Sequence, residues 1–447
     1  METFGVISLL PVTVVIVTAI ITRRALEPLM LGTFVGFFIL EQQFFVAAYL
    51  DGLWTEIGDS AYFIVIFGLF GIYNKLLEDA NAISGFTKLS TKFADTKKKT
   101  GLLTWIMGNI FFLDNYFSIL GNAVSNRKLS DSNKMSRELF AFNVNVVACA
   151  ICVLVPIALW GVFMSGNIEN VLGLEEGTGI AEIAKAVPFM FYAWVSLVFV
   201  LLYNFKIIPL FGNMKKAELR AEQTGQVFPD STPTEQTEDE EKPETNIINF
   251  LLPMIALIGT TVVTGELTYG LVVGVVLCLV MYIAQGILKP AAAFDSIVGG
   301  FCDMMICTAI VISAFVLQQA NDALGLAPFV IEAVQPFMSP NMLPVVTFCV
   351  LLSLGFVTGS FWGMAAVCFP IVLPLALAID ANLSLTIGAV ISGAAAASTV
   401  CFYCDSVTLT CSITKIKNIE YARTALPLAV PMIIVAIILY VIAGFAL

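Results

Sequence analysis

The sequence predicts an all-α integral membrane protein with two inverted repeats, each built from five transmembrane helices and one re-entrant hairpin. Three observations predict this fold class. Hydrophobic residues occupy 59% of the 447 positions and charged residues only 12%, which is unlike an ordinary soluble domain. Lys and Arg gather in a few of the loops between apolar stretches. A polar, acidic segment divides the chain near its middle.

The first repeat is expected at residues 1–212. Its apolar stretches have about the 20 residues needed to cross a bilayer. They lie near 4–22, 27–47, 61–77, 139–165 and 187–205. The first stretch is too long for the apolar part of a signal peptide and ends in Arg23 and Arg24 without a small-residue cleavage site, so we expect it to remain in the chain.

A further apolar stretch, at about 101–125, has basic residues on both sides. Because Lys and Arg concentrate in cytoplasmic loops, a full crossing would leave one basic cluster outside. We therefore expect a re-entrant hairpin that enters from the cytoplasm, turns at FFLDNYFSIL (111–120) and returns. Irregular backbone at this depth must be buried in protein or line a wet cavity.

Residues 213–246 are acidic and contain one aromatic residue, Phe228, which predicts a disordered cytoplasmic linker. Residues 247–447 then repeat the first plan. Apolar stretches lie near 247–265, 269–288, 297–320, 384–414 and 425–446, and the second hairpin is expected at about 341–378. Five crossings per half invert the second half, as in secondary transporters that bind substrate near the midplane. This topology predicts a bacterial inner-membrane protein with both termini outside.

Two aspartates fall inside apolar stretches, where an ionised side chain costs about 2.5–3.5 kcal/mol and a functional role is the first hypothesis. Asp114 lies at the expected tip of the first hairpin, and Asp405 lies in the crossing after the second. The alternative for Asp114 is a structural carboxylate that ties the hairpin to a neighbouring helix. Asp303 is a third candidate, close enough to the cytoplasmic interface to be solvated. Side-chain and backbone oxygens that suit sodium accompany the acids at Asn115, Ser118, Asn145, Thr358, Gly359, Ser360 and Thr399.

The chain has no His, which excludes hydrolysis by a nucleophile and His pair and leaves proton coupling to carboxylates. A cation bound at Asp114 or Asp405 would displace a proton from the carboxyl group, so that competition at one group couples two gradients. We expect no enzymatic activity, no cofactor other than the transported Na⁺ and H⁺, and no nucleic-acid partner, because a basic surface is missing. The expected partners are the lipid bilayer, a small cation or organic solute, and a second copy of the chain in a homodimer.

Several motifs occur in a specific order. FFLDNYFSILGN (111–122) is similar to a Phe-Phe-Asp-Asp-Tyr signature, TGSFWGM (358–364) to Thr-Gly-Thr-Ser-Trp-Gly, and ARTALPLA (422–429) to Arg-Thr-Gln-Leu-Pro. In these motifs, and over most of both halves, the chain resembles the NhaC-type sodium/proton antiporter family. Pro156 and Trp160 also fall where that family has Pro and Trp. The resemblance implies sodium/proton antiport by alternating access.

The chain departs from this family at several acidic positions. Asn115 and Asn145 stand where the family has Asp, Phe402 and Leu409 replace two further Asp residues, and Asp405 stands where the family has Ser. Asp114, which the resemblance retains, and Asp405, which stands out as an acid inside an apolar stretch, are therefore the expected ion-coupling carboxylates and candidate sodium ligands. The missing acids leave room for an alternative on the same fold, a sodium- or proton-coupled transporter of a small carboxylate or amino acid, held by helix N-termini and polar side chains. A channel or scaffold without coupling is the third hypothesis.

Overall fold

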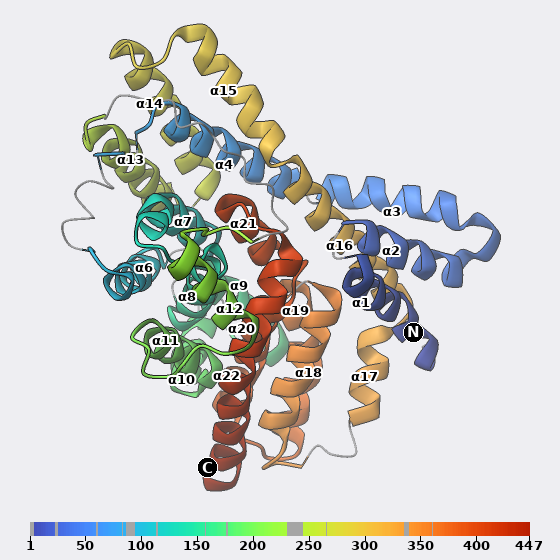
Figure 1. Cartoon of the computed structure of the whole chain (residues 1–447). Coiled ribbons are helices and arrows are strands. Elements are labelled where there is room, and N and C mark those ends of the chain that lie inside the picture. Colours follow the sequence, from blue (N-terminus) through green and yellow to red (C-terminus); the bar gives the residue numbers. More distant parts are fainter. Residues whose placement is uncertain are drawn as a thin grey trace.

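The computed structural model describes residues 4–22, 26–59, 61–82, 84–85, 94–112, 115–156, 158–175, 178–229, 245–264, 266–334, 339–359 and 361–447. Within these residues every regular element is a helix (Figure 1). In this described part of the chain, six spans are long and apolar enough to cross a membrane, or seven when a pair of helices bent by 50° at Met190 is counted as one span. Selected by length and composition, the six are Leu26–Gly58, within which the chain folds back at Gln42, and Arg137–Leu154, Leu267–Ala284, Pro290–Ala323, Leu383–Thr414 and Asn418–Ala446. The protein is therefore an all-helical, multi-pass membrane protein.

The N-terminal helices differ from the expected crossings in one place. The crossing predicted at 27–47 ends early, because the chain turns at Gln42, which has a φ of 43°, and the next helix folds back. Phe34 and Tyr49 consequently stack with ring centroids 4.3 Å apart. The polar run 41–43 is exposed at this turn, where water is a better solvent for it than lipid. The elements are η1 (Gly5–Leu9), α1 (Leu10–Thr22), α2 (Leu26–Glu41), η2 (Gln42–Phe44), α3 (Phe45–Asp59) and α4 (Ala61–Asp79).

Helix α4 packs against the helices that open the second half, and Figure 1 shows it alongside α15. A Cβ atom on Gly71 of α4 would lie 2.0 Å from the carbonyl oxygen of Gly300 of α15. Glycines at this crossing therefore allow the two backbones to touch, which is a common way for helices to associate in membranes. The second-half helices in this group are α13 (Ile248–Thr264), α14 (Leu267–Ala284) and α15 (Pro290–Asp303).

The remaining helices form the rest of the molecule. In the first half they are α6 (Lys97–Ile110), α7 (Asn115–Ser132), α8 (Arg137–Leu154), α9 (Leu159–Leu172), α10 (Gly179–Ala186), η3 (Val187–Phe189) and α11 (Phe191–Asn204). In the second half they are α16 (Met305–Ala323), α17 (Leu326–Val334), α18 (Leu343–Thr358), α19 (Phe361–Ala378), α20 (Leu383–Val400), α21 (Asp405–Thr414) and α22 (Asn418–Ala446).

Two segments, one in each half, follow the same structural pattern. Helices α7 and α19 each contain 18 residues, and so do α8 and α20, which follow them. In the connections 133–136 and 379–382, Lys134 and Asp380 both have a positive φ. Ser136 and Asn382 then cap the next helix, each accepting a hydrogen bond from a backbone N–H group in its first turn. These two segments, one from each half, therefore share their helix lengths and their capping positions.

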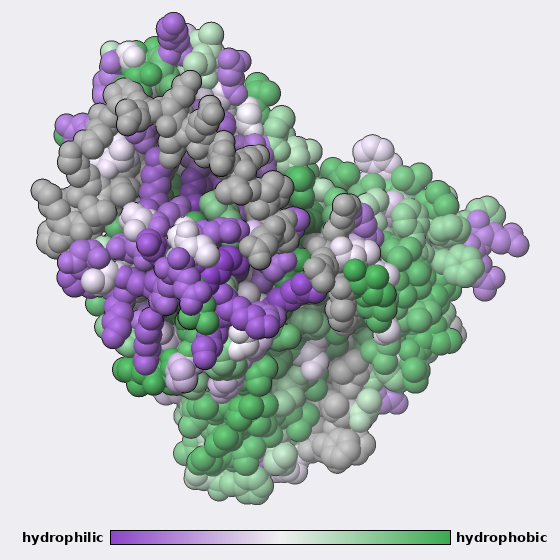
Figure 2. All heavy atoms as spheres, viewed as in Figure 1, coloured by the Kyte–Doolittle hydropathy of each residue, from purple (hydrophilic) through white to green (hydrophobic). Residues whose placement is uncertain are grey.

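Residues 213–224, which the sequence places in a disordered linker, instead form α12 (Gly212–Thr224). The prediction was wrong here because the charges of α12 are paired with charges on the first half. Lys97 Nζ lies 2.6 Å from Glu218 Oε2 and 3.1 Å from Glu222 Oε1. Figure 2 shows hydrophilic side chains gathered over this part of the molecule, whereas the surface of α1 to α3 is largely hydrophobic. Residues 230–244 lie outside the described residues.

Candidate functional site

Four helix ends in apolar stretches are followed closely by a new helix. Helix α6 ends at Ile110 before α7, α8 ends at Leu154 before α9, α18 ends at Thr358 before α19, and α20 ends at Val400 before α21. We refer to these places as the four interruptions. Backbone groups are released from the helical ladder at each of them, so each needs hydrogen-bond partners from elsewhere in the protein.

Side chains connect three of the interruptions. Trp160, near the start of α9, donates through Nε1 to Oδ1 of Asn115, the first residue of α7, over 3.2 Å. Tyr116, the next residue of α7, donates its hydroxyl to the carboxylate of Asp405, the first residue of α21. The interruptions of both halves therefore meet around one acid.

The fourth interruption is connected through Tyr403, which lies between α20 and α21. Its hydroxyl donates to the carbonyl oxygens of Phe356 and Val357, at 2.8 and 2.5 Å, in the last turn of α18. Gly359 follows with a φ of 71°, and a Cβ atom there would lie 2.6 Å from the Tyr403 ring. Both the left-handed backbone and the ring above it require glycine at this position.

Asp405 is buried, with 3% of its surface exposed. Besides the Tyr116 hydroxyl, its carboxylate accepts a hydrogen bond from the backbone N–H of Ser406 at 2.6 Å. The first turn of a helix favours a negative charge, because the peptide dipoles and free N–H groups point toward it. This position accounts for how a carboxylate is tolerated at the centre of the protein.

The other end of α21 is held by two buried arginines from the first half. Arg127 and Arg137 donate to the carbonyl oxygens of the last two residues of α21, at 2.9 and 2.8 Å. Each arginine also pairs with a carboxylate, Glu78 for Arg127 and Asp131 for Arg137. Cations at a helix C-terminus stabilise it, so the short helix α21 is fixed at both ends by residues of the first half.

Asn145 lies at a second meeting point of the two halves. Its Nδ2 donates to the carbonyl oxygen of Ser398 at 3.1 Å and to the hydroxyl of Tyr421 at 3.0 Å. Tyr421 in turn donates to the carbonyl oxygen of Thr399 at 3.2 Å, and Thr410 donates to Asn145 Oδ1 at 3.4 Å. Asn145 therefore joins α8 to α20, α21 and α22 through a buried, uncharged cluster.

The other predicted oxygen donors mostly bond to nearby backbone. Ser118 donates to the carbonyl oxygen of Gly108 at 3.0 Å, across the α6–α7 connection. The hydroxyls of Thr358 and Thr399 donate to carbonyl oxygens four residues earlier in their own helices, at 2.8 and 3.2 Å. Asn115 differs, because its Nδ2 is buried without a hydrogen-bond partner in the described part of the chain.

Asp114 and Ser360 lie outside the described residues, so their predicted roles stay predictions. Asp303 is exposed at the end of α15. Among the described residues, no three His, Cys, Asp or Glu side chains come together as metal ligands would. The acid brought to the interruptions within this part of the chain is Asp405.

Sequence reasoning did not assign roles to three tyrosines and left Trp160 as a family marker only. The tyrosines, Tyr116, Tyr403 and Tyr421, supply the hydroxyls that connect the interruptions. A usable signal was present for the first two, because both stand within two residues of a candidate acid. Tyr421 carries no comparable signal in its sequence context.

Comparison of the sequence with known proteins identifies a matching family and two relatives. The model of the Na⁺/H⁺ antiporter family matches residues 151–445, more than half of the chain. An uncharacterized protein of Haemophilus influenzae is 24% identical over 491 residues, covering 98% of this chain and 91% of that protein. The malate-2H⁺/Na⁺-lactate antiporter of Bacillus subtilis is 24% identical over 151 residues, which cover 34% of this chain and 32% of that protein.

Proposed function

Because the chain belongs to the Na⁺/H⁺ antiporter family, we propose that it exchanges sodium for protons by alternating access. The observation that supports this most directly is the meeting of the interrupted helices of both halves at Asp405. Secondary transporters bind their ions where interrupted helices of two related halves meet near the membrane midplane. A buried carboxylate at such a place is a functional group by default.

The proposed topology has two inverted repeats in the bacterial inner membrane. The pairs α6–α7 and α18–α19 each re-enter the membrane without crossing it, and both termini lie outside. The equal lengths of α7 and α19 and of α8 and α20 support the repeat. The basic residues after α7 and α21 support a cytoplasmic location for those ends.

In this mechanism Asp405 carries either a proton or a sodium ion. Tyr116 orients the carboxylate and holds α7 against α21. A change in the ion bound to Asp405 would therefore alter the contact between the two halves. Asp114 directly precedes Asn115 in the chain and is the proposed second acid. Neutral oxygens at the interruptions complete the coordination of a hard cation.

A second candidate function is coupled transport of a small organic carboxylate. Two observations favour it: the similarity over about a third of the chain to a malate/lactate antiporter, and the Nδ2 of Asn115, which has no hydrogen-bond partner among the described residues. A buried amide donor at a helix start is suited to a carboxylate oxygen. In this case sodium or protons would drive the solute.

Proteoliposomes that enclose a pH dye test the first proposal. An imposed sodium gradient should drive proton movement by the wild type, Asp405→Asn and Asp114→Asn should abolish it, and Asp303→Asn, at the exposed end of α15, should retain it. Correctly inserted wild type that ignores sodium gradients would refute sodium/proton antiport. Uptake of labelled malate or lactate by the same vesicles would then establish the second function.

A further inference from the structure

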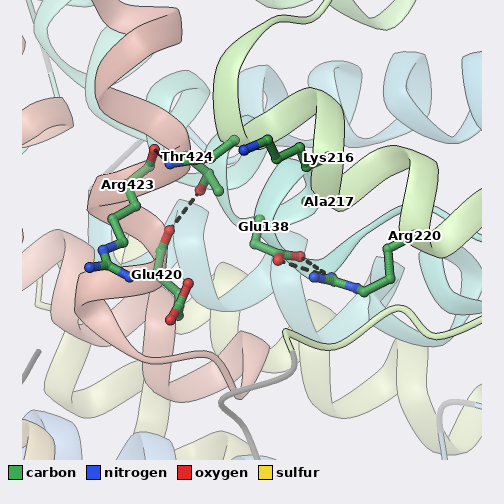
Figure 3. Close-up of a pocket in the computed structure, with 8 residues that line it drawn as sticks. Glu138, Lys216, Ala217, Arg220, Glu420, Arg423 and Thr424 are labelled. Carbon is green, nitrogen blue, oxygen red and sulfur yellow. Dashed lines mark hydrogen bonds and ion pairs between the residues drawn. The ribbon is translucent and has the colours of Figure 1, made fainter.

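A cavity of about 300 Å³ lies where α8, α12 and α22 meet, away from the interruptions. Figure 3 shows the charged side chains around it: Glu138 from α8, Lys216 and Arg220 from α12, and Glu420 and Arg423 from α22. Its volume is at the lower end of the range for small-molecule sites. None of these residues takes part in the ion site proposed above.

Arg220 is fully engaged within the protein. Its Nη2 contacts both carboxylate oxygens of Glu138 at 2.9 Å, and its Nε donates to the carbonyl oxygen of Gln226 at 3.2 Å. Since Glu138 is only 2% exposed, this pair is a buried and neutral unit. It forms one wall of the cavity and leaves little net charge for a ligand to meet.

Lys216 and Arg423 are different, because neither forms an ion pair with a carboxylate of the described residues. They approach the cavity from two helices, α12 and α22 (Figure 3). Glu420 is the one acid of the cavity lining that Arg220 does not neutralise. The charged residues that line the cavity are thus three cations and two carboxylates, an excess of one positive charge.

We propose that this cavity binds a phosphate group. A guanidinium offers paired donors that match phosphate oxygens, and an ammonium adds a point charge. The group could belong to free phosphate or to the head group of an anionic phospholipid, since the cavity lies at the hydrophilic face next to membrane-spanning helices. Both ligands present the same oxygens to Lys216 and Arg423.

A ligand at this place would contact the supports of the central cluster. Glu420 and Arg423 flank Tyr421, whose hydroxyl contacts Asn145 and the carbonyl oxygen of Thr399. Glu138 lies in the first turn of α8, the helix that carries Asn145. A phosphate group held between α12 and α22 would therefore stabilise the arrangement in which α8 and α22 are joined.

Thermal unfolding of the purified full-length protein tests the proposal with two probes. Inorganic phosphate is titrated in detergent against sodium chloride at equal sodium concentration, and choline chloride brings the two series to equal ionic strength. In parallel, the protein is placed in nanodiscs of phosphatidylglycerol or of phosphatidylcholine. At least one probe should raise the Tm of the wild type. An increase with inorganic phosphate in detergent would identify a soluble ligand, and an increase in phosphatidylglycerol nanodiscs alone would identify a lipid.

Variants separate this cavity from general charge effects. Lys216→Gln and Arg423→Gln should each raise the ligand concentration needed for the same increase in Tm about tenfold, as expected for a lost charge-assisted hydrogen bond. Lys215→Gln, the adjacent exposed lysine outside the cavity lining, should respond like the wild type. Glu420→Gln should lower the ligand concentration needed for the same increase in Tm severalfold. This variant keeps the test decisive if the first two variants fold poorly. No response to either probe, or equal responses in all variants, would overturn the proposal.

Discussion

Replacing Tyr421 by Phe would remove a single hydroxyl from the cluster that joins the two halves. The Tyr421 side chain is fully buried, and its hydroxyl accepts from Asn145 Nδ2 at 3.0 Å and donates to the Thr399 carbonyl oxygen at 3.2 Å. A neutral hydrogen bond contributes about 1 kcal/mol net. The variant should therefore lose about 2 kcal/mol, or roughly thirtyfold in an equilibrium constant.

Tyr440→Phe is the matched control. Tyr440 is equally buried, and its hydroxyl donates to the carbonyl oxygens of Phe189 and Gly388 at 2.7 and 2.9 Å, far along α22 from Tyr421. Both variants should lower Tm by similar amounts. If Tyr421 supports the ion site, only its variant should also raise the sodium concentration for half-maximal transport in proteoliposomes, by up to about thirtyfold. Equal transport in the two variants would refute that role.

Three further perturbations test the surrounding structure. Gly359→Ala should lower Tm more than Gly225→Ala. Both substitutions place a Cβ atom on a left-handed residue, which costs about 1–2 kcal/mol, but the new Cβ atom at Gly225 would have nothing within 4 Å whereas that at Gly359 would meet the Tyr403 ring. Equal decreases in Tm would contradict this packing. Arg220→Gln should destabilise the protein by about 3–5 kcal/mol by leaving the buried Glu138 carboxylate unpaired, and adding Glu138→Gln should restore most of the Tm. The pKa of Glu222 is lowered chiefly by its hydrogen bond with Lys206. The stabilisation of α12 by the Glu222 carboxylate is therefore complete above the ordinary Glu pKa and is lost as pH falls through the lower pKa of the folded state. Amide exchange in α12, corrected for intrinsic rates, should rise in that acidic window, and Glu222→Gln should remove this pH dependence.

The sequence predicted the breaks at the two expected hairpins because their signals are local, but it placed one continuous crossing at 384–414 and so missed the break between α20 and α21. Gly359 and Pro156 break helices by their own geometry, and the polar residues at 114–115 stand out in an apolar stretch. The return of α3 onto α2 was missed because a length of apolar sequence does not say whether it bends. Helix α12 was missed for another reason, since its order depends on partners such as Lys97 that are distant in the chain.

The site was harder to predict than the fold because its contacts are long-range. Tyr116 and Asp405 are separated by 289 positions, and no periodicity of either segment encodes their pairing. Asp405 could be singled out as a costly buried charge, but its partner could not. Asn145 stays a predicted oxygen ligand, and its hydrogen bonds to Ser398 and Tyr421, which join helices, were not foreseen.

The unequal lengths of α20 and α21 have an electrical consequence. With 18 and 10 residues, the two helices rise about 27 and 15 Å, and Asp405 begins the second of them. On the proposed topology, an external cation reaching Asp405 would cross about two thirds of the thickness these helices span. At a membrane potential of 100 mV this displacement corresponds to about 1.5 kcal/mol per elementary charge, or roughly tenfold in apparent affinity. Sodium binding from outside would then strengthen as the cell interior becomes more negative, while access from the cytoplasm would sense the remaining third of the field.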